Sequence, residues 1–273
     1  MLNSAQQILS GLGIHVELGT FLLLFGLIFA RMSGAITLTP FFGGRSIPGR
    51  IKVGLAVIVS MLLYANVAPE NPGPLTTVLF ACLLLKELAI GVTIGFMAQI
   101  VFNSIQMAGA MVDYGRGMSQ ATFLAPQLET NVSLLGQLQL QGALVLFLLL
   151  NGHLVFLRGM AASFQSIPIL SFPAFLSGTT PAAEQIAQYT AQSLVIALQL
   201  SAPALLALFL VDVSFGVLGR VASGLQVHTE SQPVKAMVGL AIILFALAYI
   251  FHRMPGYFAD LMEQMRVFFR NIV

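Results

Sequence analysis

Ionisable side chains inside apolar stretches are the residues of this sequence with the clearest chemical potential. Arg31, Lys86, Glu87, Asp113 and Asp212 each lie within or beside a run of apolar residues, where an unpaired charge is costly. Transporters keep such groups as ion or proton relays, but these acids are scattered along the chain, and a relay normally places several carboxylates at matching depths. Contacts to other subunits or positions facing solvent are therefore favoured over a relay.

Lys86 and Glu87 are the only two of these charges that are adjacent in the sequence. Neighbouring side chains on a helix point about 100° apart, so the two are not expected to pair simply with each other. We predict that this buried charge serves subunit assembly.

Side-chain amides form a second polar pattern. Three of them recur at spacings of four and three residues, which places them on one side of a helix, and two more share a face of the next predicted helix. Such faces need hydrogen-bonding neighbours and are poorly suited to lipid, so we predict that they are subunit contacts. The five amides are Gln99, Asn103, Gln106, Gln137 and Gln141.

A segment rich in Gly, Ser and Met lies between these two predicted helices, from Gly109 to Asn131. It is poorly suited to continue a helix and cannot lie bare in hydrocarbon, so it must be buried in protein or line an aqueous passage. Thioether and aromatic side chains fill irregular gaps, which favours a compliant stopper over a plain solvent loop. The residues that we expect to contribute are Gly109, Asp113, Gly115, Arg116, Gly117, Met118, Ser119, Phe123 and Pro126.

The residue patterns of catalytic and metal sites are missing from the sequence. His15, His153, His228 and His252 stand alone, without metal-ligand spacing, and Cys82 is the single cysteine. There is no phosphate-binding loop, nucleophile elbow or pair of carboxylates. We therefore predict a protein that is not an enzyme and that holds no cofactor or metal.

Composition identifies the class of protein that must position these residues. Apolar residues make up 58% of the chain and charged residues only 8%, whereas soluble domains carry roughly 25% charged residues. The formal net charge of +2 comes without any basic stripe, which excludes nucleic acid as a partner. The sequence predicts an all-α, multi-helix integral membrane protein in contact with lipid.

About six segments approach the roughly 20 apolar residues that cross a bilayer. We expect one domain over residues 1–273, with an amphipathic start over 1–17, helices over about 18–251 and an amphipathic tail over 255–273, whose helix begins at Pro255. Basic residues in the first loop make that loop cytoplasmic. The six segments are Leu18–Leu38, Val53–Val67, Leu75–Phe102, Val132–Leu157, Ile186–Val211 and Ala236–Phe251.

Several short motifs of this sequence are together specific for one protein family, through their order and spacing. No single motif is specific by itself. They are residues 45–52 with 54–56, Lys86-Glu87-Leu88 with Gly91 and Gly95-Phe96, Ala108-Gly109 with Gly117-Met118-Ser119 and Pro126, Asn151-Gly152-His153-Leu154, Ser163-Phe164, and Ile167-Pro168.

On these pieces the sequence resembles the FliR/SctT family, the export-gate membrane proteins of type III secretion, across nearly the whole chain. Flagellar FliR members are favoured over injectisome SctT members. The resemblance implies a subunit that combines with FliP-like and FliQ-like membrane proteins into an entrance channel for unfolded export substrates, in the bacterial inner membrane at the flagellar basal body or injectisome base. It also implies that the segment around Gly109 to Pro126 is the channel plug.

One departure concerns the loop before the last helix. The family often has Arg-x-Ala-Pro-Gln-Leu there, whereas residues 220–225 read Arg-Val-Ala-Ser-Gly-Leu. Contacts of this loop with an FlhB-like switch protein are therefore not carried over in detail. The alternative function is a secondary transporter of a small solute that uses Arg31, Asp113 and Asp212.

Overall fold

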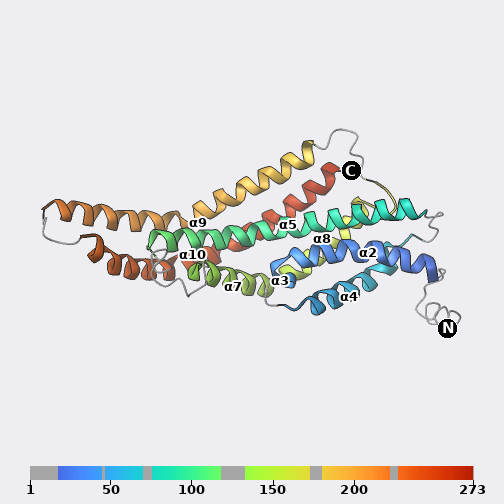
Figure 1. Ribbon diagram of the computed structural model, residues 1–273, viewed down its shortest axis with the longest axis horizontal. Coiled ribbons are helices and arrows are strands. Elements are labelled where there is room, and N and C mark those ends of the chain that lie inside the picture. The colour runs from blue at the N-terminus through green and yellow to red at the C-terminus, as the bar shows by residue number, and fades with distance from the viewer. Residues whose placement is uncertain are drawn as a thin grey trace. The chain divides into compact units, whose positions relative to one another are not determined.

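The computed structural model describes residues 18–44, 47–69, 76–117, 133–172, 180–221 and 227–272. Within these ranges the chain is helical and contains no strand, which confirms the all-α prediction. The helices, drawn in Figure 1, are α2 (Leu18–Leu38), α3 (Pro40–Gly43), α4 (Gly49–Val67), α5 (Thr77–Gly115), α7 (Leu134–Leu149), α8 (Gly152–Ser166), α9 (Thr180–Val221) and α10 (Val227–Ile272).

Four of these helices are long and apolar enough to cross a membrane. They are α2, α4, α5 and the part of α9 from Glu184 to Val221, and the interrupted pair α7 and α8 would make a fifth span. The prediction of a multi-helix membrane protein is confirmed, and the number of spans agrees roughly with the six expected. In the part of the chain that the structure describes, the predicted span Ala236–Phe251 is not among them.

The third predicted helix ends later than its sequence indicates. α5 continues from Phe102 to Gly115, so Gly109, Asp113 and Gly115 are helical and the predicted loop boundary at Gly109 is wrong. Glycine weakens a helix by about 1 kcal/mol relative to alanine. Here that cost is offset by packing, because Gly109 lies against the backbone of Gly136 on α7.

Two other predicted boundaries are also wrong. The single helix expected from Val132 to Leu157 is interrupted at Asn151, whose φ of 57° is left-handed and ends α7; asparagine is one of the few residues that adopt this conformation readily. The tail does not begin a separate helix at Pro255, because α10 runs through it. Proline removes one helical hydrogen bond, but α10 continues through both Pro233 and Pro255.

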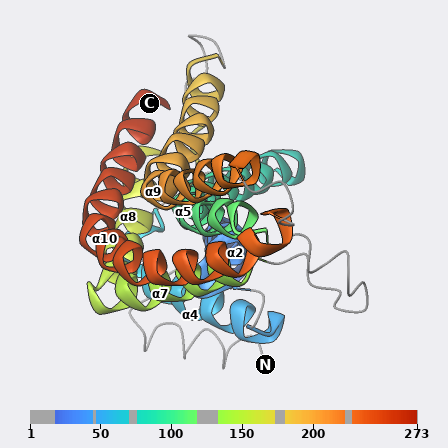
Figure 2. The same ribbon diagram turned by 90° about the vertical axis from the view of Figure 1, so that its left-hand side faces the viewer.

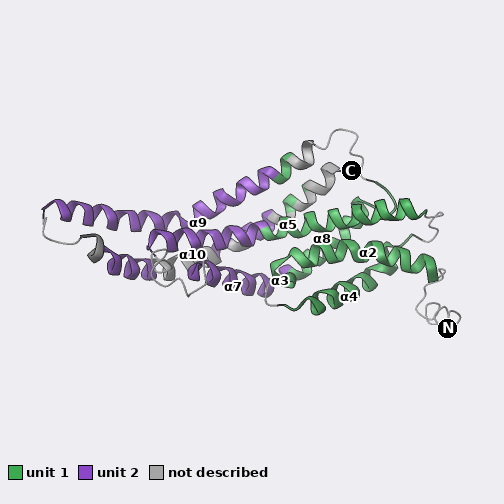
Figure 3. Ribbon diagram, viewed as in Figure 1, with its two compact units in different colours: residues 1–99, 153–186, 261–273 green, residues 100–152, 187–260 purple. Residues whose placement is uncertain are grey.

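The chain forms two compact units, coloured separately in Figure 3. Unit 1 comprises residues 1–99, 153–186 and 261–273, and unit 2 comprises residues 100–152 and 187–260.

In unit 1, α4 runs alongside α2 (Figure 1), with the rings of Phe21 and Tyr64 4.7 Å apart. The backbones of α2 and α5 also approach closely. A Cβ atom added at Gly91 would overlap the carbonyl oxygen of Arg31, and one added at Gly95 would lie 2.7 Å from the carbonyl oxygen of Ala35. Two glycines one turn apart therefore bring α5 against α2.

In unit 2, the C-terminal part of α5 lies between α9 and α7 (Figure 2). Val112 of α5, Leu135 of α7, and Ala204 and Leu208 of α9 form a buried apolar cluster there. A second contact is aromatic: the ring of Phe147 on α7 packs edge-on to Phe102 of α5 at 5.4 Å and to Phe258 of α10 at 4.9 Å.

Candidate functional site

A buried cluster of charges in unit 1 is the most highly connected polar feature of the described residues. It begins with Arg31, which is 0% exposed in the middle of α2. Its Nε donates to Oε2 of Glu87 at 2.5 Å and its Nη2 donates to Oε1 at 3.0 Å, a two-pronged pairing with α5. Such planar, bidentate pairs are the strong form of an ion pair.

Two further N–H groups of the Arg31 guanidinium bind α8 and the turn that follows it. Nη1 donates to Oγ of Ser163 at 3.1 Å, and Nη2 donates to the carbonyl oxygen of Ile167 at 2.9 Å. The guanidinium also lies 4.0 Å from the ring centre of Phe164, a favourable stacking position. One side chain thus joins α2, α5 and α8.

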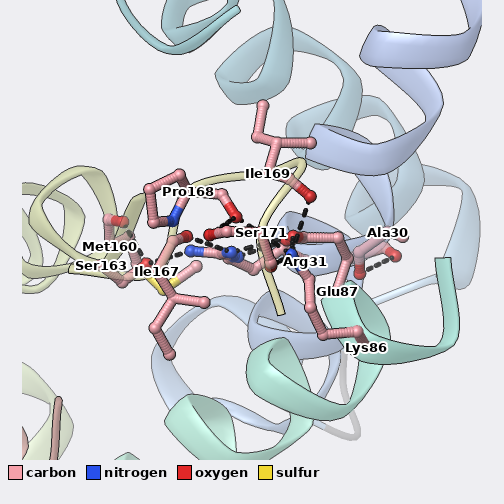
Figure 4. Close-up of polar contacts among 11 residues, drawn as sticks. Ala30, Arg31, Lys86, Glu87, Met160, Ser163, Ile167, Pro168, Ile169 and Ser171 are labelled. Atoms are coloured by element: carbon pink, nitrogen blue, oxygen red, sulfur yellow. Dashed lines mark hydrogen bonds and ion pairs between the residues drawn. The ribbon is translucent and has the colours of Figure 1, made fainter. Parts of the chain in front are cut away.

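Lys86 occupies the other side of the same carboxylate. Its Nζ lies 2.7 Å from Oε1 of Glu87, so the expectation that these neighbours would not pair is wrong. The side-chain directions diverge at Cβ, but the four-carbon lysine stem is long enough to turn back. Figure 4 shows Arg31, Lys86 and Glu87 converging with the turn after α8.

Carbonyl oxygens of that turn complete the site around Lys86. Nζ donates to the carbonyl oxygens of Pro168 at 3.1 Å, Ile169 at 2.7 Å and Ser171 at 2.9 Å. Two cations share one carboxylate, and backbone oxygens supply the rest of the negative potential. Because these bonds lie within the chain and Glu87 is 0% exposed, the cluster holds the helices of unit 1 together. That Lys86 and Glu87 also serve subunit assembly stays a prediction.

A second polar centre lies in unit 2, around Asp113 near the end of α5. Oδ2 accepts a hydrogen bond from Oγ of Ser133 at 2.7 Å and one from the backbone N–H of Leu135 at 2.9 Å, and Oδ1 lies 3.3 Å from Nη1 of Arg116. Ser133 is the N-cap of α7 and accepts from the N–H of Gly136 at 2.8 Å. Asp113 therefore fixes the start of α7 to the end of α5.

Arg116 and Gly117, which follow α5, are seated on α10. The aliphatic part of Arg116 lies against Gly239, where a Cβ atom would overlap it, and Gly117 lies against the side-chain amide of Gln232. Gly117 has a φ of 78°, a conformation that glycine adopts without strain. The other residues predicted for the stopper, Met118, Ser119, Phe123 and Pro126, lie outside the described residues.

None of the predicted amides takes part in the hydrogen bonds described for the charge cluster. Gln99, Gln106 and Gln137 are partly exposed, and Asn103 and Gln141 are exposed. The buried amide is instead Gln139, which is 3% exposed and whose Oε1 has no hydrogen-bond partner among the described residues. Asp212, which the alternative relay would use, pairs with Lys235 near the surface. The side chain of Asp212 is 50% exposed.

The sequence did not identify the members of the charge cluster that come from α8 and the turn after it. Ser163 and the carbonyl groups of the turn give no signal of their own, because any residue supplies a carbonyl oxygen. Arg31 did give one, since an arginine in the middle of an apolar helix needs an anion. No group of three or more His, Cys, Asp or Glu residues that could hold a metal occurs in the described ranges, and Cys82 is exposed.

Comparison with known proteins places this geometry in context. The model of a family described as "Bacterial export proteins, family 1" matches residues 22–261. The chain is 30% identical over 243 residues to the flagellar biosynthetic protein FliR of Bacillus subtilis, covering 89% of this chain and 93% of that protein. It is 29% identical to FliR of Escherichia coli over 78% of this chain and 80% of the relative. It is 28% identical to the Yop proteins translocation protein T of Yersinia pestis over 85% and 88% of the two chains.

Proposed function

This chain belongs to the bacterial export proteins, family 1, and from that premise we propose that it is the FliR-type subunit of a type III protein-export gate. The observation that carries the proposal is the family match over residues 22–261, which takes in nearly all of the described helices. The chain is a membrane component of the export apparatus, and a flagellar system is favoured over an injectisome. Its proposed location is the bacterial inner membrane, at the base of the flagellum or injectisome.

In this role the chain combines with FliP-like and FliQ-like membrane proteins into the entrance channel for unfolded export substrates. Exposed amides on largely apolar helices support a protein partner over lipid at those positions. Asn103 on α5 and Gln141 on α7 are both exposed, and a side-chain amide facing hydrocarbon has no hydrogen-bond partner. An FlhB-like switch protein is a further proposed partner.

The test is co-expression of the tagged chain with its FliP-like and FliQ-like neighbours, followed by purification in mild detergent. We expect one complex that contains all three proteins. Replacing Asn103 and Gln141 together by leucine should reduce recovery of the partners, while Gln139→Leu, at a buried position, serves as the matched control for the loss of an amide. A stable, monodisperse chain that binds neither partner would contradict the export-gate role.

The channel plug is proposed to be the segment from Gly109 to Pro126, whose first residues, as far as Gly115, form the end of α5. Two features support this position. Arg116 and Ser133, which come before and after residues 118–132 in the sequence, both contact the carboxylate of Asp113. Gly117 supplies a left-handed turn at the point where the chain leaves α5. A passage wide enough for an unfolded polypeptide needs such a filled resting state to hold back ions.

The alternative, a secondary transporter, gains no support from the geometry. It required Arg31, Asp113 and Asp212 as relay groups, but each of these has partners within the chain. Arg31 is bound to Glu87, Asp113 caps α7 and Asp212 pairs with Lys235. We propose no catalytic role for the chain, since a gate subunit provides a path and not a reaction.

A further inference from the structure

The surroundings of Lys86 resemble a binding site for a small cation more than they resemble an ordinary salt bridge. Three carbonyl oxygens, from Pro168, Ile169 and Ser171, lie 2.7 to 3.1 Å from Nζ, and Oε1 of Glu87 lies at 2.7 Å. Carbonyl oxygens of one short turn, together with one carboxylate oxygen, can bind a hard monovalent cation or accept hydrogen bonds from an ammonium group. An ordinary salt bridge between a surface lysine and one carboxylate lacks these additional carbonyl oxygens.

The hydrogen bonds within the turn end on one of these oxygens, that of Pro168, which also accepts from Oγ of Ser171 at 3.2 Å, and they do not gather the other two. Among the backbone bonds of residues 167–172, Ile167 N donates to Ser163 O as α8 ends, and Ser171 N donates to Pro168 O at a long 3.3 Å. Carbonyl groups that point at one place repel one another unless a positive charge lies between them. We propose that this turn is a monovalent-cation site, permanently filled by the ammonium group of Lys86, and that the tethered cation sets the conformation of the turn.

Glu87 couples this site to the rest of unit 1. The same carboxylate that binds Nζ of Lys86 also binds the guanidinium of Arg31, and Arg31 itself donates to the carbonyl oxygen of Ile167, at the start of the turn. The turn after α8 is therefore held by two cations, one from α2 and one from α5. This inference does not depend on the proposed function, because it concerns how unit 1 folds.

The site differs from that of Lys52, which offers a matched control in the same unit. Nζ of Lys52 donates to one carbonyl oxygen, that of Gly43, at 2.5 Å. Both lysines are partly exposed. Pro168 and Ser171 are exposed as well, so other parts of this chain do not cover the turn on that side.

The experiment is chemical rescue of the full-length chain in isolated membranes, measured as the amount of chain that survives limited proteolysis. Lys86→Ala should reduce the surviving chain by about tenfold, because hydrogen bonds to a charged group are lost. Ammonium chloride should restore most of the surviving chain. Tetramethylammonium chloride at the same concentration should not, because that ion is bulkier and has no N–H. Lys86→Met keeps the stem and fills the space, so ammonium should not rescue it. Lys52→Ala should respond equally to both salts.

Rescue of Lys86→Ala by both salts alike, or equal rescue of Lys86→Met, would overturn the proposal. A second measurement needs no variant: reductive methylation of the unaltered chain in its native state, followed by mass spectrometry. We expect Lys86 to remain unmodified under conditions that methylate Lys52, and to react once the chain is denatured. Native methylation of Lys86 as fast as of Lys52 would show that its ammonium group is not enclosed.

Discussion

At the scale of single residues, Glu87 and Asp113 organise their surroundings in the same way. Each is a carboxylate of α5 that is almost completely buried, at 0% and 5% exposure. Each is bound by groups of one other helix and by a basic residue close to it in the sequence, Lys86 for Glu87 and Arg116 for Asp113, which is how a buried charge is accommodated. Substituting either one should therefore affect several elements together, unlike the loss of an exposed ion pair.

The first prediction concerns Glu87→Ala. It leaves the buried Arg31 without its anion and removes one partner of Lys86, and loss of one member of a buried pair costs roughly 3 to 5 kcal/mol. The midpoint of thermal unfolding of the detergent-solubilised chain, with any partners bound, should fall markedly. Asp212→Ala removes a half-exposed partner of Lys235 and should cost no more than about 1 kcal/mol. Equal shifts for the two variants would show that the Glu87 cluster contributes no special stability.

The second prediction concerns Asp113→Ala. The buried N–H of Leu135 loses its acceptor, and leaving such a donor unsatisfied costs about 1 to 3 kcal/mol. Hydrogen exchange measured by mass spectrometry should become faster in the first turn of α7, from Ser133 to Gln137. Asp260→Ala, at an exposed position of α10, should leave that exchange unchanged. If exchange does not change in Asp113→Ala either, Ser133 alone is sufficient to cap α7.

At the scale of elements, the contact between α2 and α5 depends on glycine. Arg31 can meet Glu87 because the two helices lie close enough for their backbones to touch at Gly91, and a side chain there would separate them. The close approach and the charge cluster are therefore parts of one arrangement.

The third prediction compares Gly91→Ala with Gly54→Ala. At Gly91 the added methyl group overlaps the backbone of α2, and overpacking of this kind costs about 1 to 3 kcal/mol. At Gly54 on α4 nothing lies within 4 Å of the added atom, so alanine should stabilise the helix by roughly 0.5 to 1 kcal/mol. The two thermal midpoints should thus shift in opposite directions. A midpoint for Gly91→Ala at or above that of the unaltered chain would argue against the close contact.

At the scale of the whole molecule, the chain is proposed to work only within an assembly, and the resting seal is the property to measure. Its proposed plug runs from Gly109 to Pro126, and past the end of α5 the chain is anchored on α10 at Arg116 and Gly117. A change confined to the segment beyond that anchor leaves the described contacts of Asp113 and Arg116 in place.

The fourth prediction is that deleting residues 118–122 raises the conductance of the membrane to small ions, while the complex with FliP-like and FliQ-like proteins still assembles. Bulk that filled the passage is lost, but its anchors remain. Ion leak is measured in liposomes that contain the purified complex. A variant in which Gly and Ser replace the same residues separates loss of bulk from loss of length. An assembled deletion variant without added leak would place the seal in the partner subunits.

The sequence by itself determined the class of the molecule and much of its architecture. Long apolar segments, few charges and helical spacing are local properties, so an all-α membrane protein could be predicted from them, and the order of short motifs predicted the family. It also identified Arg31, Lys86, Glu87 and Asp113 as residues that need partners, because the cost of burying a charge depends on its surroundings and not on its eventual neighbour.

Only the tertiary structure decided which groups those partners are. The pairing of Glu87 with Arg31 joins residues 56 positions apart, and the oxygens around Lys86 are backbone atoms of a turn more than 80 residues away. No local pattern encodes such contacts. The same holds for α5, whose extension to Gly115 depends on the backbone of Gly136 packing against Gly109. Propensity set the expected start of the loop at Gly109, but a close helix contact reverses the preference, because a missing side chain is what allows two backbones to meet.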